Sequence, residues 1–147
     1  MKRYFDDFHV GDRFRSAPCT INERQIIAFA GEFDPQPFHL DREEAKQTLF
    51  GGLVASGWHT AAITMRLIVE SDLNIAGGIV GLGVDELRFP KPVRPGDTLQ
   101  VVSEILGLRL SRSRPDRGLV VVSSVTTNQD GVAVLTMKST LLVNRRA

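Results

Sequence analysis

The chain has 147 residues, 42% of them hydrophobic and 24% charged, and a formal net charge of +1. This composition is typical of one globular domain over residues 1–147; it excludes a disordered chain, gives no general attraction for nucleic acid, and offers no apolar run that could span a membrane. Because the single cysteine, Cys19, allows no internal disulfide and the charged N-terminus does not resemble a signal peptide, we expect a cytoplasmic protein.

The first elements are predicted to be a short strand and a helix. Residues 13–19 follow a Gly-Asp turn and favour a strand. The helix start fits a capping box, in which the side chains of Thr20 and Glu23 satisfy free backbone N–H groups. The helix should end near Asp34, because a residue before proline is driven out of helical geometry.

A short helix capped by Asp41 and a long helix over about 54–69 follow. The long helix is apolar over most of its circumference, so we expect it to lie in the middle of the fold. The remaining chain is β-rich, and its predicted strands cover residues 80–89, 99–107, 118–127 and 132–143. The pattern predicts an α+β fold in which an antiparallel sheet wraps around a central helix.

Asp34 and His39 form the first candidate site, since they lie five residues apart at the end of the first helix. A carboxylate and an imidazole in contact can hold a water molecule between them and divide the proton transfers of its addition or removal. In the alternative interpretation, Asp34 only caps a turn and His39 packs beside Phe38. The spacing alone favours this alternative, because Asp-Pro pairs are common in turns.

The start of the long helix is the second candidate. A helix N-terminus presents unpaired N–H groups, and glycines at 51, 52 and 57 would let a ligand oxygen approach them closely. The alternative is that these glycines only permit tight packing. Ser56 lacks the Gly-x-Ser-x-Gly pattern of a serine hydrolase, and no cluster with metal-ligand spacing is present.

Three other features favour structural interpretations. His9 and His59 have no spaced partner and are expected to be structural or surface residues. The basic residues between Arg109 and Arg117 are expected to form a solvated hairpin, although they could reach a phosphate.

These motifs together resemble the MaoC-like dehydratase family, which includes (R)-specific enoyl-CoA hydratases. Asp34-Pro-Gln-Pro-Phe-His39 is similar to the family's hydratase signature, usually Asp-x-Asn-Pro-x-His. Residues 51–57 (Gly-Gly-Leu-Val-Ala-Ser-Gly) resemble its glycine-rich entry to the long helix. Residues 89–99 (Phe-Pro-Lys-Pro-Val-Arg-Pro-Gly-Asp-Thr-Leu) resemble its turn-and-strand segment. The resemblance extends over nearly the whole chain and favours a functional Asp34–His39 pair.

The resemblance implies a hot-dog fold, a homodimer or larger homo-oligomer, and reversible hydration of trans-2-enoyl-CoA to (R)-3-hydroxyacyl-CoA. It implies no cofactor or metal beyond the CoA, or acyl-carrier group, of the substrate. By the same resemblance, Asp34 and His39 hold the water and the Gly57 N–H binds the thioester oxygen. The remaining expected substrate-binding residues are Ser56, Gln36 and Trp58.

Two departures from the family pattern bear on the pocket. Gln36 replaces the usual Asn, and Ser56 stands where many members have His. Trp58 and His59 could narrow the acyl pocket or simply pack. Two other functions stay open on this fold: an acyl-CoA thioesterase and a non-catalytic acyl-thioester binding module. The presence of both Asp34 and His39 favours hydration over either.

Overall fold

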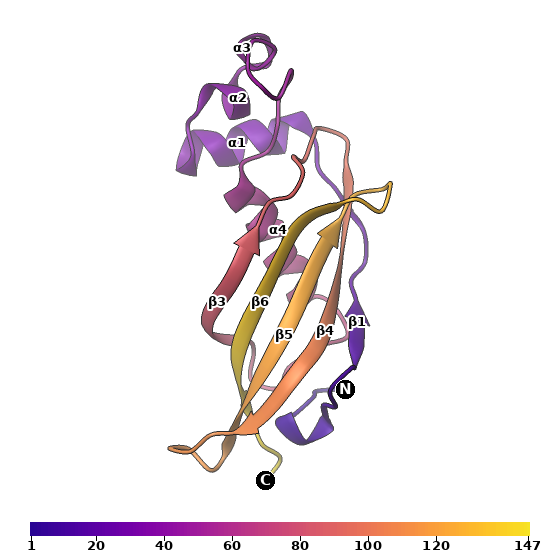
Figure 1. Cartoon of the computed structure of the whole chain (residues 1–147), viewed down its shortest axis with the longest axis vertical. Helices are drawn as coiled ribbons and strands as arrows, with labels where there is room; N and C mark the ends of the chain where they lie inside the picture. Colours follow the sequence, from indigo (N-terminus) through magenta and orange to yellow (C-terminus); the bar gives the residue numbers. More distant parts are fainter.

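The computed structural model describes all 147 residues, and its main feature is a curved antiparallel sheet (Figure 1). The strand order is β1-β4-β5-β6-β3, and β2 also pairs with β4. The strands are β1 (Arg13–Arg15), β2 (Cys19–Thr20), β3 (Val80–Arg88), β4 (Thr98–Leu110), β5 (Arg117–Thr127) and β6 (Ala133–Asn144). All four predicted C-terminal strands are present, whereas the predicted strand over 13–19 is divided into β1 and β2.

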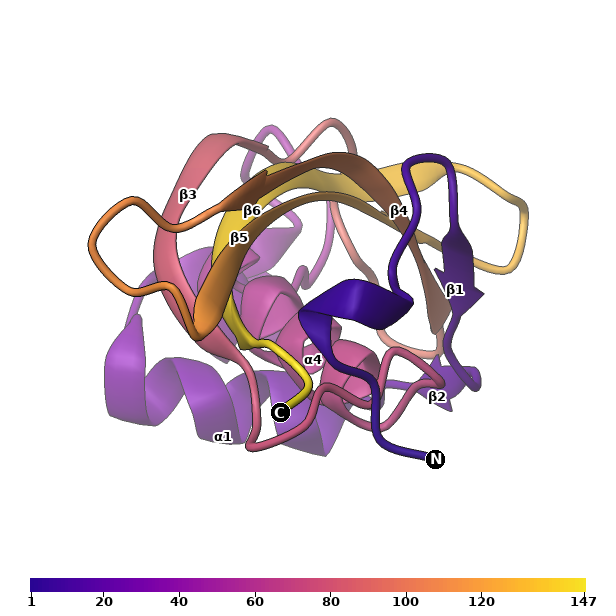
Figure 2. The ribbon, with the colours of Figure 1, turned by 90° about the horizontal axis from the view of Figure 1, so that it is seen from below.

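The sheet arches over the long helix α4 (Gly57–Val69), as Figure 2 shows from one end. The helix begins three residues later than predicted, because Ser56 is its N-cap and accepts a hydrogen bond from the Trp58 N–H. A buried hydrogen bond of 2.6 Å between the hydroxyls of Thr64 and Thr126 joins the helix to β5. The predicted α+β arrangement, a sheet wrapped around a central helix, is therefore confirmed.

The prediction that α4 is buried on most sides is wrong. The side facing the sheet is buried, but Trp58, Met65 and Val69 are 61%, 40% and 55% exposed. The sheet can cover only the side of the helix around which it curves. The apolar residues on the other side have no partner within the chain.

Three short helices cover one end of the sheet and helix: α1 (Glu23–Phe33), α2 (Pro37–Leu40) and α3 (Arg42–Ala45). A single 3₁₀ turn, η1 (Phe5–Asp7), lies near the N-terminus. The predicted cap of α3 by Asp41 is present. The capping box of α1 is formed by Asn22 and Gln25, not by Thr20 and Glu23, because Thr20 belongs to β2 and pairs with Thr98.

A β-bulge near the end of β3 directs the chain into the site. The register of β3 against β6 shifts between Asp85 and Arg88, and Glu86 has a left-handed backbone with φ of 53°. Bulges bend a strand and re-aim the side chains that follow. Phe89 comes directly after this bend and packs against the start of α4.

No helix is both long and apolar enough to cross a membrane.

Candidate active site

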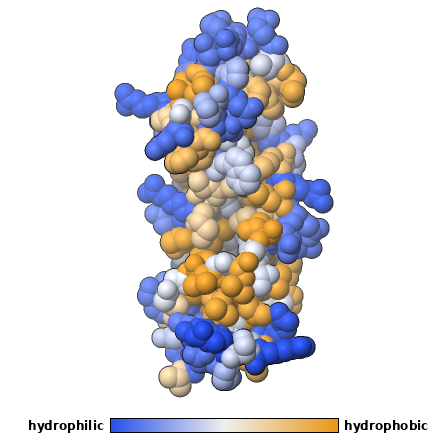
Figure 3. All heavy atoms as spheres, turned by 90° about the vertical axis from the view of Figure 1, so that its left-hand side faces the viewer, coloured by the Kyte–Doolittle hydropathy of each residue, from blue (hydrophilic) through white to orange (hydrophobic).

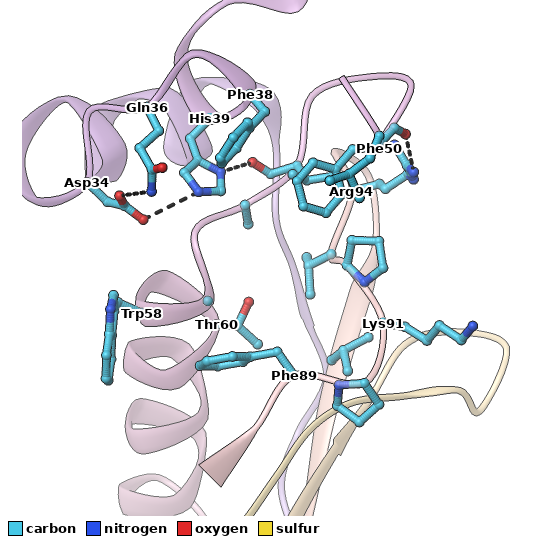
Figure 4. Close-up of a pocket in the computed structure, with 18 residues that line it drawn as sticks. Asp34, Gln36, Phe38, His39, Phe50, Trp58, Thr60, Phe89, Lys91 and Arg94 are labelled. Atoms are coloured by element: carbon cyan, nitrogen blue, oxygen red, sulfur yellow. Dashed lines mark hydrogen bonds and ion pairs between the residues drawn. The ribbon is translucent and has the colours of Figure 1, made fainter. Parts of the chain in front are cut away.

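The fold brings Asp34 and His39 together. Asp34 is the C-cap of α1, where the following proline ends the helix, and His39 lies on the single turn of α2. His39 Nε2 lies 3.3 Å from Asp34 Oδ2, and the two side chains are only 7% and 17% exposed (Figure 4). An acid and an imidazole of this separation can share a water molecule or a proton.

The orientation of His39 is set by a backbone carbonyl. Its Nδ1 lies 2.7 Å from the Val54 oxygen, which can only accept a hydrogen bond, so Nδ1 carries a proton. The second ring nitrogen, Nε2, points toward Asp34 and carries a proton only in the imidazolium form. The nitrogen that faces the carboxylate is therefore the one free to exchange a proton.

Two neighbours hold the Asp34 carboxylate. The Ser56 hydroxyl donates a hydrogen bond of 2.7 Å to Oδ2, and the Gln36 amide donates one of 2.6 Å to Oδ1. The Ser56 bond, together with Gln36 and the nearby His39, lowers the pKa of Asp34 from its ordinary value, although burial acts in the opposite direction. Asp34 is accordingly an ionised proton acceptor at neutral pH.

Ser56 lies behind Asp34 and not on the pocket surface where substrate contact was expected. It is completely buried, and its hydroxyl both accepts from the Trp58 N–H at the start of α4 and donates to Asp34. Gln36 does line the pocket but also holds the carboxylate. The structure thus places both residues where they position Asp34.

Of the three glycines predicted at the start of the long helix, Gly57 is the first residue of α4. Gly51 and Gly52 lie in the preceding loop. The Gly57 N–H donates no hydrogen bond within the chain. A Cβ at this position would lie 2.9 Å from the Phe89 ring, so only glycine fits here without displacement. A free N–H at a helix N-terminus is suited to bind a developing oxyanion.

A pocket of about 580 Å³ connects these groups. Trp58 and Phe89 form one wall and meet edge to face, with ring centroids 6.3 Å apart (Figure 4). Sequence reasoning missed Phe89, Phe50, Lys91 and Arg94 among the lining residues. Phe89, Lys91 and Arg94 belong to residues 89–99, which were interpreted as a turn and a strand and not as part of the site.

The other candidates have structural surroundings. His59 is buried and stacks on Phe29 with ring centroids 4.6 Å apart, and burial lowers its pKa. The hairpin arginines Arg114 and Arg117 pair with Asp116 in solvent, as expected. No three His, Cys, Asp or Glu side chains are grouped as metal ligands.

Ser56→Ala should move the acid limb of the pH–rate profile to higher pH. The substitution removes the largest influence that lowers the pKa of Asp34, so the carboxylate would become protonated, and inactive as a base, at a higher pH. We expect kcat at neutral pH to fall by about tenfold, because a hydrogen bond to a charged group is lost. Ser56→Thr, which keeps the hydroxyl, is the matched variant; equal acid limbs in Ser56→Ala and the wild type would contradict this role.

The fold and site define a class: a helix wrapped by an antiparallel sheet, with an acid–base pair facing a free helix N-terminus in one pocket. The model of the MaoC like domain matches residues 7–129. The chain is 34% identical to the YdeM protein of Bacillus subtilis over 140 residues, covering 95% of this chain and 98% of that one. It is 28% identical to an (R)-specific enoyl-CoA hydratase of Rhodospirillum rubrum, covering 97% and 93% of the two chains.

A solved structure, a MaoC-like dehydratase from Rhodospirillum rubrum, superposes with a TM-score of 0.95 at 54% identity and covers 99% of both chains. The chain therefore belongs to the MaoC-like dehydratase family, and its fold is the hot-dog fold. Both features agree with the resemblance found in the sequence.

Proposed function

We propose that the chain is a hydro-lyase that reversibly hydrates a trans-2-enoyl thioester to the (R)-3-hydroxyacyl thioester. The single observation that carries this proposal is the Asp34–His39 contact, 3.3 Å long and facing a pocket beside the free N–H of Gly57. Relatives that are named as hydratases or dehydratases of acyl thioesters support the reaction class. The proposed reaction uses no cofactor other than the carrier of the substrate.

The proposed mechanism adds one water across the double bond. Asp34 and His39 Nε2 hold the water, and a proton passes from it to Asp34 as its oxygen bonds to the β-carbon. Electron density moves to the thioester oxygen, where the Gly57 N–H stabilises the enolate. The pair then returns one proton to the α-carbon, so both side chains end in their starting states.

The direct test is the loss of enoyl-thioester ultraviolet absorbance with crotonyl-CoA, followed by chiral analysis of the product. We expect (R)-3-hydroxybutyryl-CoA and no free thiol. Release of thiol would instead identify the thioesterase, and no turnover of short, long or branched enoyl thioesters would favour the binding module.

We also propose that the protein works as a homodimer. Strand β3 is the last strand of the sheet, so one of its edges is unpaired, and Val80, Leu82 and Val84 are 50%, 57% and 53% exposed. Figure 3, which views this side of the molecule, shows hydrophobic atoms along its middle, flanked by hydrophilic residues. An unpaired, apolar edge strand is a template for another chain. Pairing of β3 with β3 of a second copy would also cover Met65 of α4.

Leu82→Lys should convert the dimer to a monomer, because it places a charge in the centre of this surface. The wild type should show twice the 16.2 kDa chain mass by light scattering, and the variant the mass of one chain. Leu110→Lys is the matched control, since Leu110 is similarly exposed at 52% but lies at the far end of β4. A wild type that is monomeric at micromolar concentration would refute the proposed dimer.

A further inference from the structure

The catalytic pocket has a basic side. Three charged residues line it: Asp34, and, on the side away from that carboxylate, Lys91 and Arg94 (Figure 4). Neither Lys91 nor Arg94 forms an ion pair. Most of the ion pairs that the chain does form join an arginine or a lysine to a carboxylate. Two unpaired positive charges at a pocket raise the local concentration of anions there.

The segment that carries these cations is held rigidly. Prolines flank Lys91 on both sides, which fixes the backbone torsion of each proline. The Arg94 N–H donates to Asp97 Oδ2 at 2.9 Å, and its guanidinium donates to the Phe50 carbonyl at 2.6 Å. A guanidinium has five N–H donors, so most of those of Arg94 stay available for a ligand.

We propose that Lys91 and Arg94 form an anion subsite that binds the phosphate groups of the CoA carrier. This inference rests on the proposed function, which places the reacting carbons at Asp34 and His39 and leaves the carrier to extend toward the other side. Guanidinium and ammonium groups are well suited to phosphate oxygens. Leu49, which is 90% exposed, and Phe50 line the same part of the pocket and offer apolar contact to the adenine.

Crotonyl-CoA and crotonyl-pantetheine test this subsite, because they share the acyl group and only the first carries phosphates. Lys91→Met should raise KM for crotonyl-CoA about two- to fivefold, as for loss of an exposed charge pair, with kcat unchanged. Its KM for crotonyl-pantetheine should equal that of the wild type. Lys91→Arg, which keeps the positive charge, should retain the wild-type KM for crotonyl-CoA. Lys46→Met, which removes an exposed lysine outside the pocket, should change the KM of neither thioester.

A carboxylate at the end of the acyl group would present the same anionic chemistry, so mesaconyl-CoA provides a further arm. If Lys91→Met impairs mesaconyl-CoA but not crotonyl-CoA, the cations bind the acyl carboxylate and the carrier assignment is overturned. Equal losses with crotonyl-CoA and crotonyl-pantetheine, or no loss with either, would also overturn it.

Binding of unacylated CoA, measured by titration calorimetry, separates this inference from the proposed function. The wild type should bind CoA, and Lys91→Met should weaken this binding by about the factor expected for the KM of crotonyl-CoA. This result would support the subsite even if no enoyl thioester is hydrated. Hydration of both crotonyl thioesters with CoA binding insensitive to Lys91 would leave the proposed function standing and refute the subsite.

Discussion

Asp34→Asn should lower kcat for crotonyl-CoA hydration by about a thousandfold, within the range for loss of a positioned general base. The amide has nearly the shape of the carboxylate but cannot accept the proton of water. In the wild type, the Ser56 hydroxyl is the main cause of the lowered pKa of Asp34, so the carboxylate is ionised at neutral pH. The wild-type rate should therefore be lost only as the pH falls through this lowered pKa, because protonation then removes the base. The measurement is kcat by loss of enoyl absorbance across this pH range.

Glu32→Gln is the matched control for Asp34→Asn. It removes a carboxylate from the same helix, two residues away, but Glu32 is exposed and does not line the pocket. Its rate should equal that of the wild type. A similar rate loss in both variants, or a rate for Asp34→Asn within threefold of the wild type, would exclude Asp34 as the base.

The elements that the sequence predicts well have strong local causes. Asp34 ends α1 because a proline follows it, and the Asn128–Gly131 turn joins β5 to β6 because glycine supplies the positive φ of 74°. The cap of α1 was misplaced because Asn22 and Gln25 form the same pattern as Thr20 and Glu23, two residues further on. Only the pairing of Thr20 with β4 decides between them, and that pairing is a long-range contact.

The site was predictable in its chemistry but not in its arrangement. The residue types and spacing of Asp34 and His39 indicate an acid–base pair. The roles of Ser56 and Lys91 depend on how α4 and the segment after β3 meet α1. These are long-range contacts, and no local sequence pattern predicts them. The exposed side of α4 has the same explanation: apolar periodicity shows that a face is to be buried, but not which chain buries it.

His39→Asn should lower kcat by about a hundredfold or more while leaving the fold intact. The Asn amide can take the place of Nδ1 and donate to the Val54 carbonyl, but it has no counterpart of Nε2, which faces Asp34. The variant therefore removes the proton-exchanging nitrogen and keeps the structural hydrogen bond. The measurements are kcat with crotonyl-CoA and the thermal midpoint of unfolding.

His39→Leu separates the two roles of the imidazole from the other side. It removes both nitrogens and leaves the buried Val54 carbonyl without its donor, which should cost about 1–3 kcal/mol of stability. The two variants should thus share the loss of rate and differ in stability. If His39→Asn kept nearly the full rate and only His39→Leu were impaired, His39 would serve solely to fix α2 on the segment before α4. The water would then be activated by Asp34 alone.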